Sequence, residues 1–171
     1  MVREIKEKMC FTATDRSHFK KLYSAKDSQC VVMYKLPDGT SVKLDHERYL
    51  CPEILFEPDS EIHTGKSLPH LIESSVNDID MTLRREMYSC VIVSGGSSFF
   101  PKFTDRLQRE LLSLTPPGVH HVQLCAYPQR RHQEWLGGSM LASLSSFQKD
   151  WVSVKDYEEH GPNIICRNNF F

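Results

Sequence analysis

The sequence has 171 residues, of which 40% are hydrophobic and 25% are charged, and this composition is typical of a soluble globular protein. Lysine and arginine total 21 against 22 aspartate and glutamate, which argues against a surface for nucleic acid or anionic membranes. No segment approaches the roughly 20 apolar residues of a membrane span, and the N-terminus lacks the apolar core of a secretory signal.

The first part of the chain mixes helical and extended patterns. Residues 2–10 are helical by composition, and the polar residues 16–30 predict a loop or a frayed helix. Asp38 and Gly39 lie between two short alternating apolar runs, which predicts a β-hairpin. Pro52 marks the place where a helix or turn is expected to begin.

The middle of the chain predicts a loop, a broken helix and a strand. Residues 57–69 are polar and contain two prolines and a glycine, so we expect a loop. Residues 70–89 have helical spacing that breaks between Asp78 and Asp80. The short apolar run at residues 90–93 predicts a strand.

The last part of the chain repeats the alternation of helix and strand. A helix beginning near residue 103 is predicted by the apolar face formed by Phe103, Leu107, Leu111 and Leu114. Residues 119–127 alternate as a strand does. One final helix from Leu136 is predicted to carry Met140, Leu144, Phe147 and Trp151 on one side. Strands alternating with helices predict an α/β or mixed fold.

The stretch SGGSSFFP, residues 94–101, joins a predicted strand to a predicted helix. Gly95 and Gly96 would let the backbone approach a ligand, Ser97 and Ser98 offer hydroxyls, and the following helix would point its positive end at the turn. The motif is neither a P-loop nor a dinucleotide fingerprint. A tight turn with a serine N-cap is the alternative, and the motif alone leaves both open.

Other candidate sites have equally ordinary explanations. Gly137 and Gly138 repeat the double-glycine theme before the last helix, or simply permit close helix packing. His120 and His121 would point to opposite faces of a strand, and no third ligand is suitably spaced, so we expect no metal site.

Two charged pairs have a functional and a structural interpretation. Lys6 and Glu7 could hold a base and a ribose, or could lie on a solvated helix face with i,i+4 charge pairs. Arg130 and Arg131 could meet a phosphate or an adenine ring, or could belong to a solvated turn.

The six cysteines are widely spaced, with no CxxC pair. We therefore expect a reduced cytosolic or nuclear protein whose thiols are mostly buried.

Taken together and in this order, four stretches resemble the C-terminal half of actin and the actin-related proteins. They are residues 2–10, 36–58, 76–111 and 135–171, and the similarity is weakest at residues 12–32 and 59–70. The resemblance implies an α/β, actin-like ATPase fold of the ribonuclease-H-like class, truncated to its C-terminal half. The divergence is of the size expected for a testis-type actin-like paralogue rather than a conventional actin.

The resemblance also implies three parts. Residues 1–62 would belong to the smaller-sheet lobe of the nucleotide cleft, residues 63–131 to the core of the larger lobe, and residues 132–171 to the C-terminal helices. In the family numbering of subdomains these are similar to the fourth, third and first.

The resemblance implies an adenine-nucleotide site made of Lys6, Glu7, Gly95, Gly96, Ser97, Phe100 and Arg131. In the family the double-glycine turn lies beside ATP, an aromatic residue at the position of Phe100 lies against adenosine, and the pair at Lys6 and Glu7 touches adenine and ribose. Arg131 stands where the family usually has a lysine over the base, which keeps the charge but changes the shape of the contact.

The phosphate side of such a site is not found in these 171 residues. The family holds phosphates and Mg²⁺ with an Asp-Asn-Gly-type loop and an Asp-x-Gly loop, and the sequence offers no substitute for them. We therefore expect weak binding of ATP or ADP, Mg²⁺ only if an N-terminal half is supplied, and no enzymatic activity.

Several departures from the family bear on assembly. Residues 59–66 are mostly polar where filament-forming actins carry an apolar plug, and the penultimate cysteine is missing. Leu141 and Leu144 match the family's ligand groove, but Asp150 replaces an apolar residue there. These changes argue against conventional filaments and conventional groove ligands.

These observations predict a non-enzymatic structural or interaction protein of the cytoplasm and cytoskeleton. It would have a partial adenine-nucleotide cleft, and its partners would be proteins, among them actin or actin-binding proteins, and not nucleic acid or membranes. The alternative is an incomplete isoform of an ATP-binding actin-related ATPase. A regulator that docks on actin by imitating half a subunit is a third hypothesis.

Overall fold

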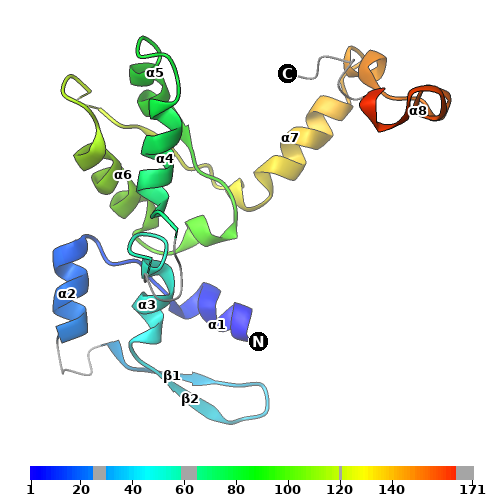
Figure 1. The fold of residues 1–171 in the computed structure, drawn as a ribbon. Coiled ribbons are helices and arrows are strands. Elements are labelled where there is room, and N and C mark those ends of the chain that lie inside the picture. Colours follow the sequence, from blue (N-terminus) through cyan, green and yellow to red (C-terminus); the bar gives the residue numbers. More distant parts are fainter. Residues whose placement is uncertain (25–29, 59–64, 120, 165–171) are drawn as a thin grey trace. The chain divides into compact units, whose positions relative to one another are not determined.

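The computed structural model describes residues 1–24, 30–58, 65–119 and 121–164 (Figure 1). The chain divides into two compact units, residues 1–131 and residues 132–171. The predictions for the polar segment at residues 59–64, for His120 and for the C-terminal residues 165–171 lie outside the described residues. No helix in the described ranges has both the length and the apolar character needed to cross a membrane.

The first unit contains helices and four short strands. Its elements in chain order are α1 (Val2–Met9), α2 (Arg16–Ser24), β1 (Val32–Lys35), β2 (Ser41–Leu44), α3 (Glu47–Glu53), α4 (Leu68–Asn77), α5 (Arg84–Ser89), β3 (Val91–Ile92), the 3₁₀ helix η2 (Gly96–Phe99), α6 (Phe103–Leu114) and β4 (Leu124–Cys125). The predicted mixture of helix and strand is confirmed, although the strands are shorter than expected.

The predicted hairpin is present. β1 and β2 pair antiparallel, from Val32 opposite Leu44 to Lys35 opposite Ser41. Gly39 has φ +88°, which a glycine adopts without strain, and the Asp38 carboxylate accepts the N–H of Thr40 at 2.8 Å. The Asp-Gly pair therefore closes the turn in the way its sequence predicts.

Pro52 lies in the last turn of α3, so a helix does not begin there, but a turn does, because the N–H of Leu55 donates to the Pro52 carbonyl at 3.1 Å. Proline has no N–H, and it therefore leaves a carbonyl one turn earlier without its helical donor. The backbone N–H of Phe11 donates to that carbonyl, on Arg48, at 2.9 Å. The Arg48 carbonyl therefore links α3 to the segment after α1 by a hydrogen bond instead of bonding within the helix.

The break predicted between Asp78 and Asp80 is confirmed by the boundary between α4 and α5. The Asp80 carboxylate accepts the N–H of Thr82 at 2.8 Å, which forms a local turn. Arg84 donates to the carbonyls of Ile79 at 3.0 Å and Asn77 at 2.7 Å. The bond to Asn77 satisfies a carbonyl that the end of α4 leaves without a helical partner, and the bond to Ile79 holds the turn that follows.

The core of the first unit lies between α4, α6 and a two-stranded parallel sheet. β3 pairs with β4 in the register Val91 opposite Leu124 and Ile92 opposite Cys125. The apolar face predicted for α6 is confirmed, since Phe103, Leu107 and Leu111 are at most 3% exposed. The core cluster comprises Cys10, Phe56, Val76, Tyr88, Val93, Phe100, Phe103, Leu107, Leu111 and Val122.

The second unit corrects two predictions. It contains α7 (Gln133–Ala142), the 3₁₀ helices η4 (Phe147–Asp150) and η5 (Gly161–Asn163), and α8 (Val154–His160). The prediction of one continuous helix to Trp151 is therefore wrong. Helix α7 ends before Ser143, which lies in a serine-rich stretch and whose hydroxyl donates to the Ser139 carbonyl at 2.7 Å. The prediction of a double-glycine turn before this helix is also wrong, because Gly137 and Gly138 lie inside α7.

Residues 16–24 form α2, which confirms the helical alternative for this stretch, and Asp15 precedes its first turn. The Asp15 carboxylate accepts the Ser17 hydroxyl at 2.6 Å and the His18 N–H at 2.8 Å. These bonds, led by that of Ser17, lower the pKa of Asp15 from 3.8 to about 2.

A pH titration of stability tests this cap. A carboxyl whose pKa is lower in the folded state contributes stability above its unfolded pKa, and that contribution is lost as the pH falls through the folded value. We expect the melting temperature of the wild type to fall more between pH 4 and pH 2 than that of Asp15→Asn, which keeps the cap but does not titrate. Parallel pH profiles for the two proteins would refute the assignment.

Candidate functional site

The double-glycine turn is fixed by bonds to the segment after β4. Gly95 has φ +86°, a conformation that side-chain-bearing residues rarely adopt. Its N–H donates to the Arg130 carbonyl at 2.8 Å, and the Ser94 hydroxyl donates to the same carbonyl at 2.9 Å. The turn is thus held against residues that follow the neighbouring parallel strand.

The side chain of Arg130 completes this attachment. Its Nε donates to the Ser98 hydroxyl at 2.9 Å, Nη2 donates to the Ser98 carbonyl at 3.2 Å, and the guanidinium lies 3.9 Å from the centre of the Phe99 ring. Ser98 is buried and its hydroxyl donates to the Gly95 carbonyl at 2.7 Å. Of the two serine hydroxyls proposed for a ligand, that of Ser98 is engaged within the turn, whereas Ser97 is exposed.

Glu7, on α1, bonds to Arg131, the residue after Arg130. Its carboxylate lies 2.8 Å from Nη2 of Arg131 and 3.1 Å from Nε of Arg3. The hydrogen bond from Arg131, followed by that from Arg3, lowers the pKa of Glu7. A Cβ added to Gly96 would lie 4.0 Å from Nε of Arg131, an ordinary van der Waals distance, so Gly96 lies beside this guanidinium. The structure therefore brings together Glu7, Gly96 and Arg131.

The other predicted site residues lie differently. Phe100 is 7% exposed and belongs to the core cluster, whereas its neighbour Phe99 is 41% exposed. Lys6 is half-exposed on α1, and adjacent helical residues point about 100° apart, so it does not share the direction of Glu7. The roles given to these residues stay predictions.

The helix α6 begins at Phe103 as predicted, but it does not follow the double-glycine turn directly. The turn enters the one-turn helix η2, and α6 begins only at Phe103. Pro101 follows η2, and Lys102 then takes a left-handed conformation with φ 67° before α6 starts. The expectation that α6 points its positive end directly at the glycines is therefore wrong, because these residues separate the two.

The family model described as actin matches residues 1–170. The chain belongs to the actin family. This match covers almost the whole chain and confirms the resemblance that its motifs suggested, and with it an actin-like fold.

Members of the actin family typically bind ATP or ADP, and the family's cofactor includes Mg²⁺. The residues of this site fit the nucleotide and the metal differently. The cluster of Glu7, Gly96 and Arg131 offers a planar cation and a carboxylate, which suit a base and sugar hydroxyls. It does not suit Mg²⁺, which requires several oxygen ligands, because its one carboxylate is already paired with two arginines. Within the described ranges, no group of three or more His, Cys, Asp or Glu side chains is arranged to hold a metal.

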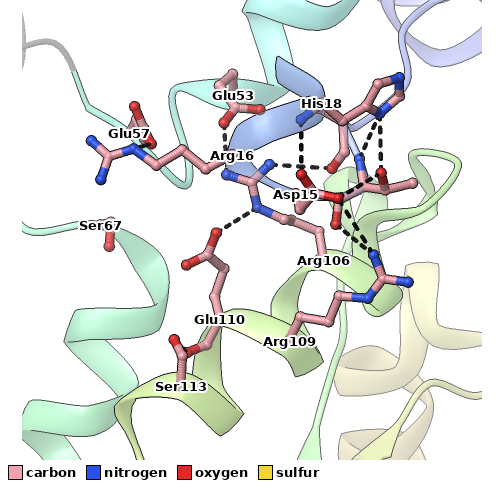
Figure 2. A network of polar contacts seen from close by, with 12 residues as sticks. Asp15, Arg16, His18, Glu53, Glu57, Ser67, Arg106, Arg109, Glu110 and Ser113 are labelled. Carbon is pink, nitrogen blue, oxygen red and sulfur yellow. Dashed lines mark hydrogen bonds and ion pairs between the residues drawn. The ribbon is translucent and has the colours of Figure 1, made fainter. Parts of the chain in front are cut away.

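A second polar cluster of this actin-family chain was missed by the sequence analysis (Figure 2). The side chain of Arg106, in α6, is 1% exposed, and its Nη2 lies 2.8 Å from Oε1 of Glu53 in α3. Its Nε donates to Glu110 at 2.7 Å, and its Nη1 donates to the Ala13 carbonyl at 3.3 Å. The guanidinium also lies 5.0 Å from the centre of the Phe56 ring.

Sequence spacing contained a signal for this cluster. Arg106 lies three residues after Phe103 and one before Leu107, so it occupies the apolar face of α6. A buried charge must be paired. Burial raises the pKa of Glu53, and the Arg106 charge opposes that shift, while Oε2 of Glu53 has no hydrogen-bond partner. Arg106 therefore joins α3, α6 and the segment after α1 through one side chain.

The cysteines contradict the expectation of mostly buried thiols. Of the five in the described ranges, all free, only Cys10 is buried; Cys51 and Cys90 are exposed, and Cys30 and Cys125 lie between. Cys166 lies outside the described residues.

Proposed function

We propose that this chain is a non-enzymatic structural and interaction protein of the cytoskeleton, located in the cytoplasm. We also propose that it binds an adenine nucleotide weakly, through the base and ribose. The observation that supports the nucleotide site is the meeting of Glu7, Gly96 and Arg131, which come from three separate segments. The family match supports the general class, in which ATP or ADP is the usual ligand.

The chemistry of these three residues suits a nucleoside. A guanidinium is flat and stacks on aromatic faces, so Arg131 would cover the base. The Glu7 carboxylate only accepts hydrogen bonds, which suits the hydroxyls of ribose. Gly96 lies beside the Arg131 guanidinium. Binding has to compete with the existing bond between Glu7 and Arg131, which is one reason to expect weak affinity.

The interaction role is supported by apolar side chains at the surface of the second unit. Those exposed by half or more are Trp135, Met140, Leu141, Leu144, Trp151, Val154 and Tyr157. A concentration of exposed apolar groups is typical of protein interfaces. We propose that the partners are proteins, actin among them. The non-enzymatic role is supported by the sequence, which contains no Asp-x-Gly triplet of the kind that holds phosphates and Mg²⁺ in the family.

A thermal melt of the purified chain during titration with nucleotide tests the site. A ligand at about 100 times its dissociation constant that binds only the folded state adds about 2.7 kcal/mol. We expect the titrations to give similar dissociation constants for ATP and adenosine, with or without Mg²⁺. Arg131→Ala should weaken binding about tenfold, while Arg131→Lys, which restores the residue usual in the family, should not.

Arg85→Ala, an exposed arginine on α5, is the matched control and should leave the titration unchanged. A shift that requires Mg²⁺ and is accompanied by phosphate release would replace the proposal with the ATPase alternative. No shift with adenosine would exclude the nucleoside site. Sedimentation of the chain with actin filaments tests the interaction role, and a chain that stays in the supernatant would remove actin from its partners.

A further inference from the structure

Two cysteines lie on the same face of the parallel sheet. Along β3 and β4, Val93, Val122 and Leu124 face the core. Successive residues of a strand point to opposite faces, so Ile92 and Cys125 belong to the other face, and Cys90 directly precedes β3. On that face Ile92 is 61% exposed, and Cys90 is exposed as well. Both thiols therefore lie toward the open side of the sheet.

The register makes these cysteines neighbours. Ile92 lies opposite Cys125, and the N–H of Val91 donates to the Gln123 carbonyl at 3.0 Å. Cys90 therefore lies one diagonal step from Cys125. The two thiols are near enough to influence each other: burial raises the pKa of the Cys125 thiol, and the Cys90 thiol is the next cause.

We propose that Cys90 and Cys125 are an oxidative modification site, at which a peroxide joins the two residues in a reversible disulfide between β3 and β4. In the first step the sulfur of exposed Cys90 attacks one peroxide oxygen; an S–O bond forms, the O–O bond breaks and water leaves. The Cys125 sulfur then attacks the Cys90 sulfur; the S–S bond forms, the S–O bond breaks and a second water leaves. Two thiols are oxidised by two electrons, and one hydrogen peroxide is reduced to two waters.

The geometry indicates that this bond is a labile one. Parallel strands lie about 4.8 Å apart and rise about 3.3 Å per residue, so diagonal neighbours have Cα atoms about 8 Å apart, whereas disulfides usually join Cα atoms about 4.4–6.8 Å apart. Cys90 must therefore move toward β4. It lies between α5 and β3, with φ −145° and ψ 71°, outside the regular strand conformation. A bond formed by such a movement is strained, and strained exposed disulfides are the easily reduced ones.

A second pair, Cys10 and Cys51, provides a contrast within the same chain. Cys10 is 8% exposed, and burial, followed by the neighbouring Cys51 thiol, raises its pKa to about 11. At neutral pH about one such thiol in ten thousand is ionised, and the thiolate is the reactive form. Cys10 is therefore a poor partner for disulfide formation, although it too has a thiol neighbour.

Peptide mapping of the oxidised wild-type chain tests the proposal. The 171-residue protein is treated with hydrogen peroxide, its remaining thiols are alkylated, and it is digested without reductant. We expect a linked pair of peptides containing Cys90 and Cys125, lighter by about 2 Da than the two reduced peptides and separated by dithiothreitol. Cys90→Ser should lower formation of this product more than about tenfold, and Cys10→Ser, the matched control, should leave it unchanged.

The remaining outcomes contradict the proposal. They are a linkage of Cys10 to Cys51 in place of the expected one, a linkage between chains, and recovery of Cys90 as sulfinic acid beside a reduced Cys125. Because the mapping is done on the wild type, it does not depend on the folding of any variant. The mapping also detects the cross-link directly, so its result does not depend on whether the chain binds a nucleotide.

Discussion

Replacing Arg106 with alanine is expected to lower the free energy of unfolding by about 3–5 kcal/mol. The guanidinium bonds to Glu53 at 2.8 Å, Glu110 at 2.7 Å and the Ala13 carbonyl at 3.3 Å. Its removal would leave the Glu53 carboxylate buried without a countercharge, and a buried unpaired charge is among the most unfavourable groups in a fold. Urea denaturation measures the loss.

Arg109→Ala is the matched control, because Arg109 lies on the same helix and is exposed. It bonds to the Thr14 carbonyl at 3.2 Å and lies 3.9 Å from the Asp15 carboxylate, and its loss should change stability by less than about 1 kcal/mol. A double variant, Arg106→Met with Glu53→Met, removes both buried charges and should recover most of the loss. Equal effects of Arg106→Ala and Arg109→Ala would show that the buried pair contributes no more to the free energy of unfolding than an exposed arginine does.

Replacing Leu111 with alanine is expected to lower the free energy of unfolding by about 2–5 kcal/mol. Leu111 is 0% exposed and lies in the core cluster, where α6 faces the parallel sheet and α4. The substitution removes buried methyl groups and leaves a cavity that rigid neighbours fill only in part. Thermal and urea denaturation of the same variant should report a similar loss.

Leu112 provides the control for this prediction. It is the next residue of α6 and is 46% exposed. The same chemical change, Leu112→Ala, should therefore alter stability by only about 0.5 kcal/mol. A large loss at Leu112, or a small one at Leu111, would mean that the inner face of α6 has been assigned incorrectly.

Local patterns predicted those parts of the fold that local interactions decide. The Asp38–Gly39 hairpin, the break after Asp78 and the apolar face of α6 all follow from a few neighbouring residues. One departure from the predictions arose where a contact between distant segments decides the outcome. Pro52 is tolerated inside α3 because Phe11 bonds to the carbonyl that it frees, and no local pattern shows that.

The candidate site was predictable to a similar extent. The double-glycine motif and the resemblance identified the segments that carry Glu7, Gly96 and Arg131, which the structure brings together. The orientation of side chains was not predictable, because the pattern SSFF does not reveal which residue of each pair faces inward. The Ser98 hydroxyl donates to the Gly95 carbonyl inside the turn. Phe100 packs in the core, while Phe99 lies at the surface.

The bonds of Arg106 also determine when the first unit can fold during synthesis. Its partners Glu53 and Ala13 precede it by 53 and 93 residues, so the bonds close large loops. Contacts between segments so far apart in sequence slow folding. During synthesis α1 to α5 emerge before α6, so until then the Glu53 carboxylate lacks the arginine with which it pairs in the folded unit. A product that ends before residue 106 lacks Arg106, Leu107 and Leu111, and therefore cannot form this buried pair or complete this core.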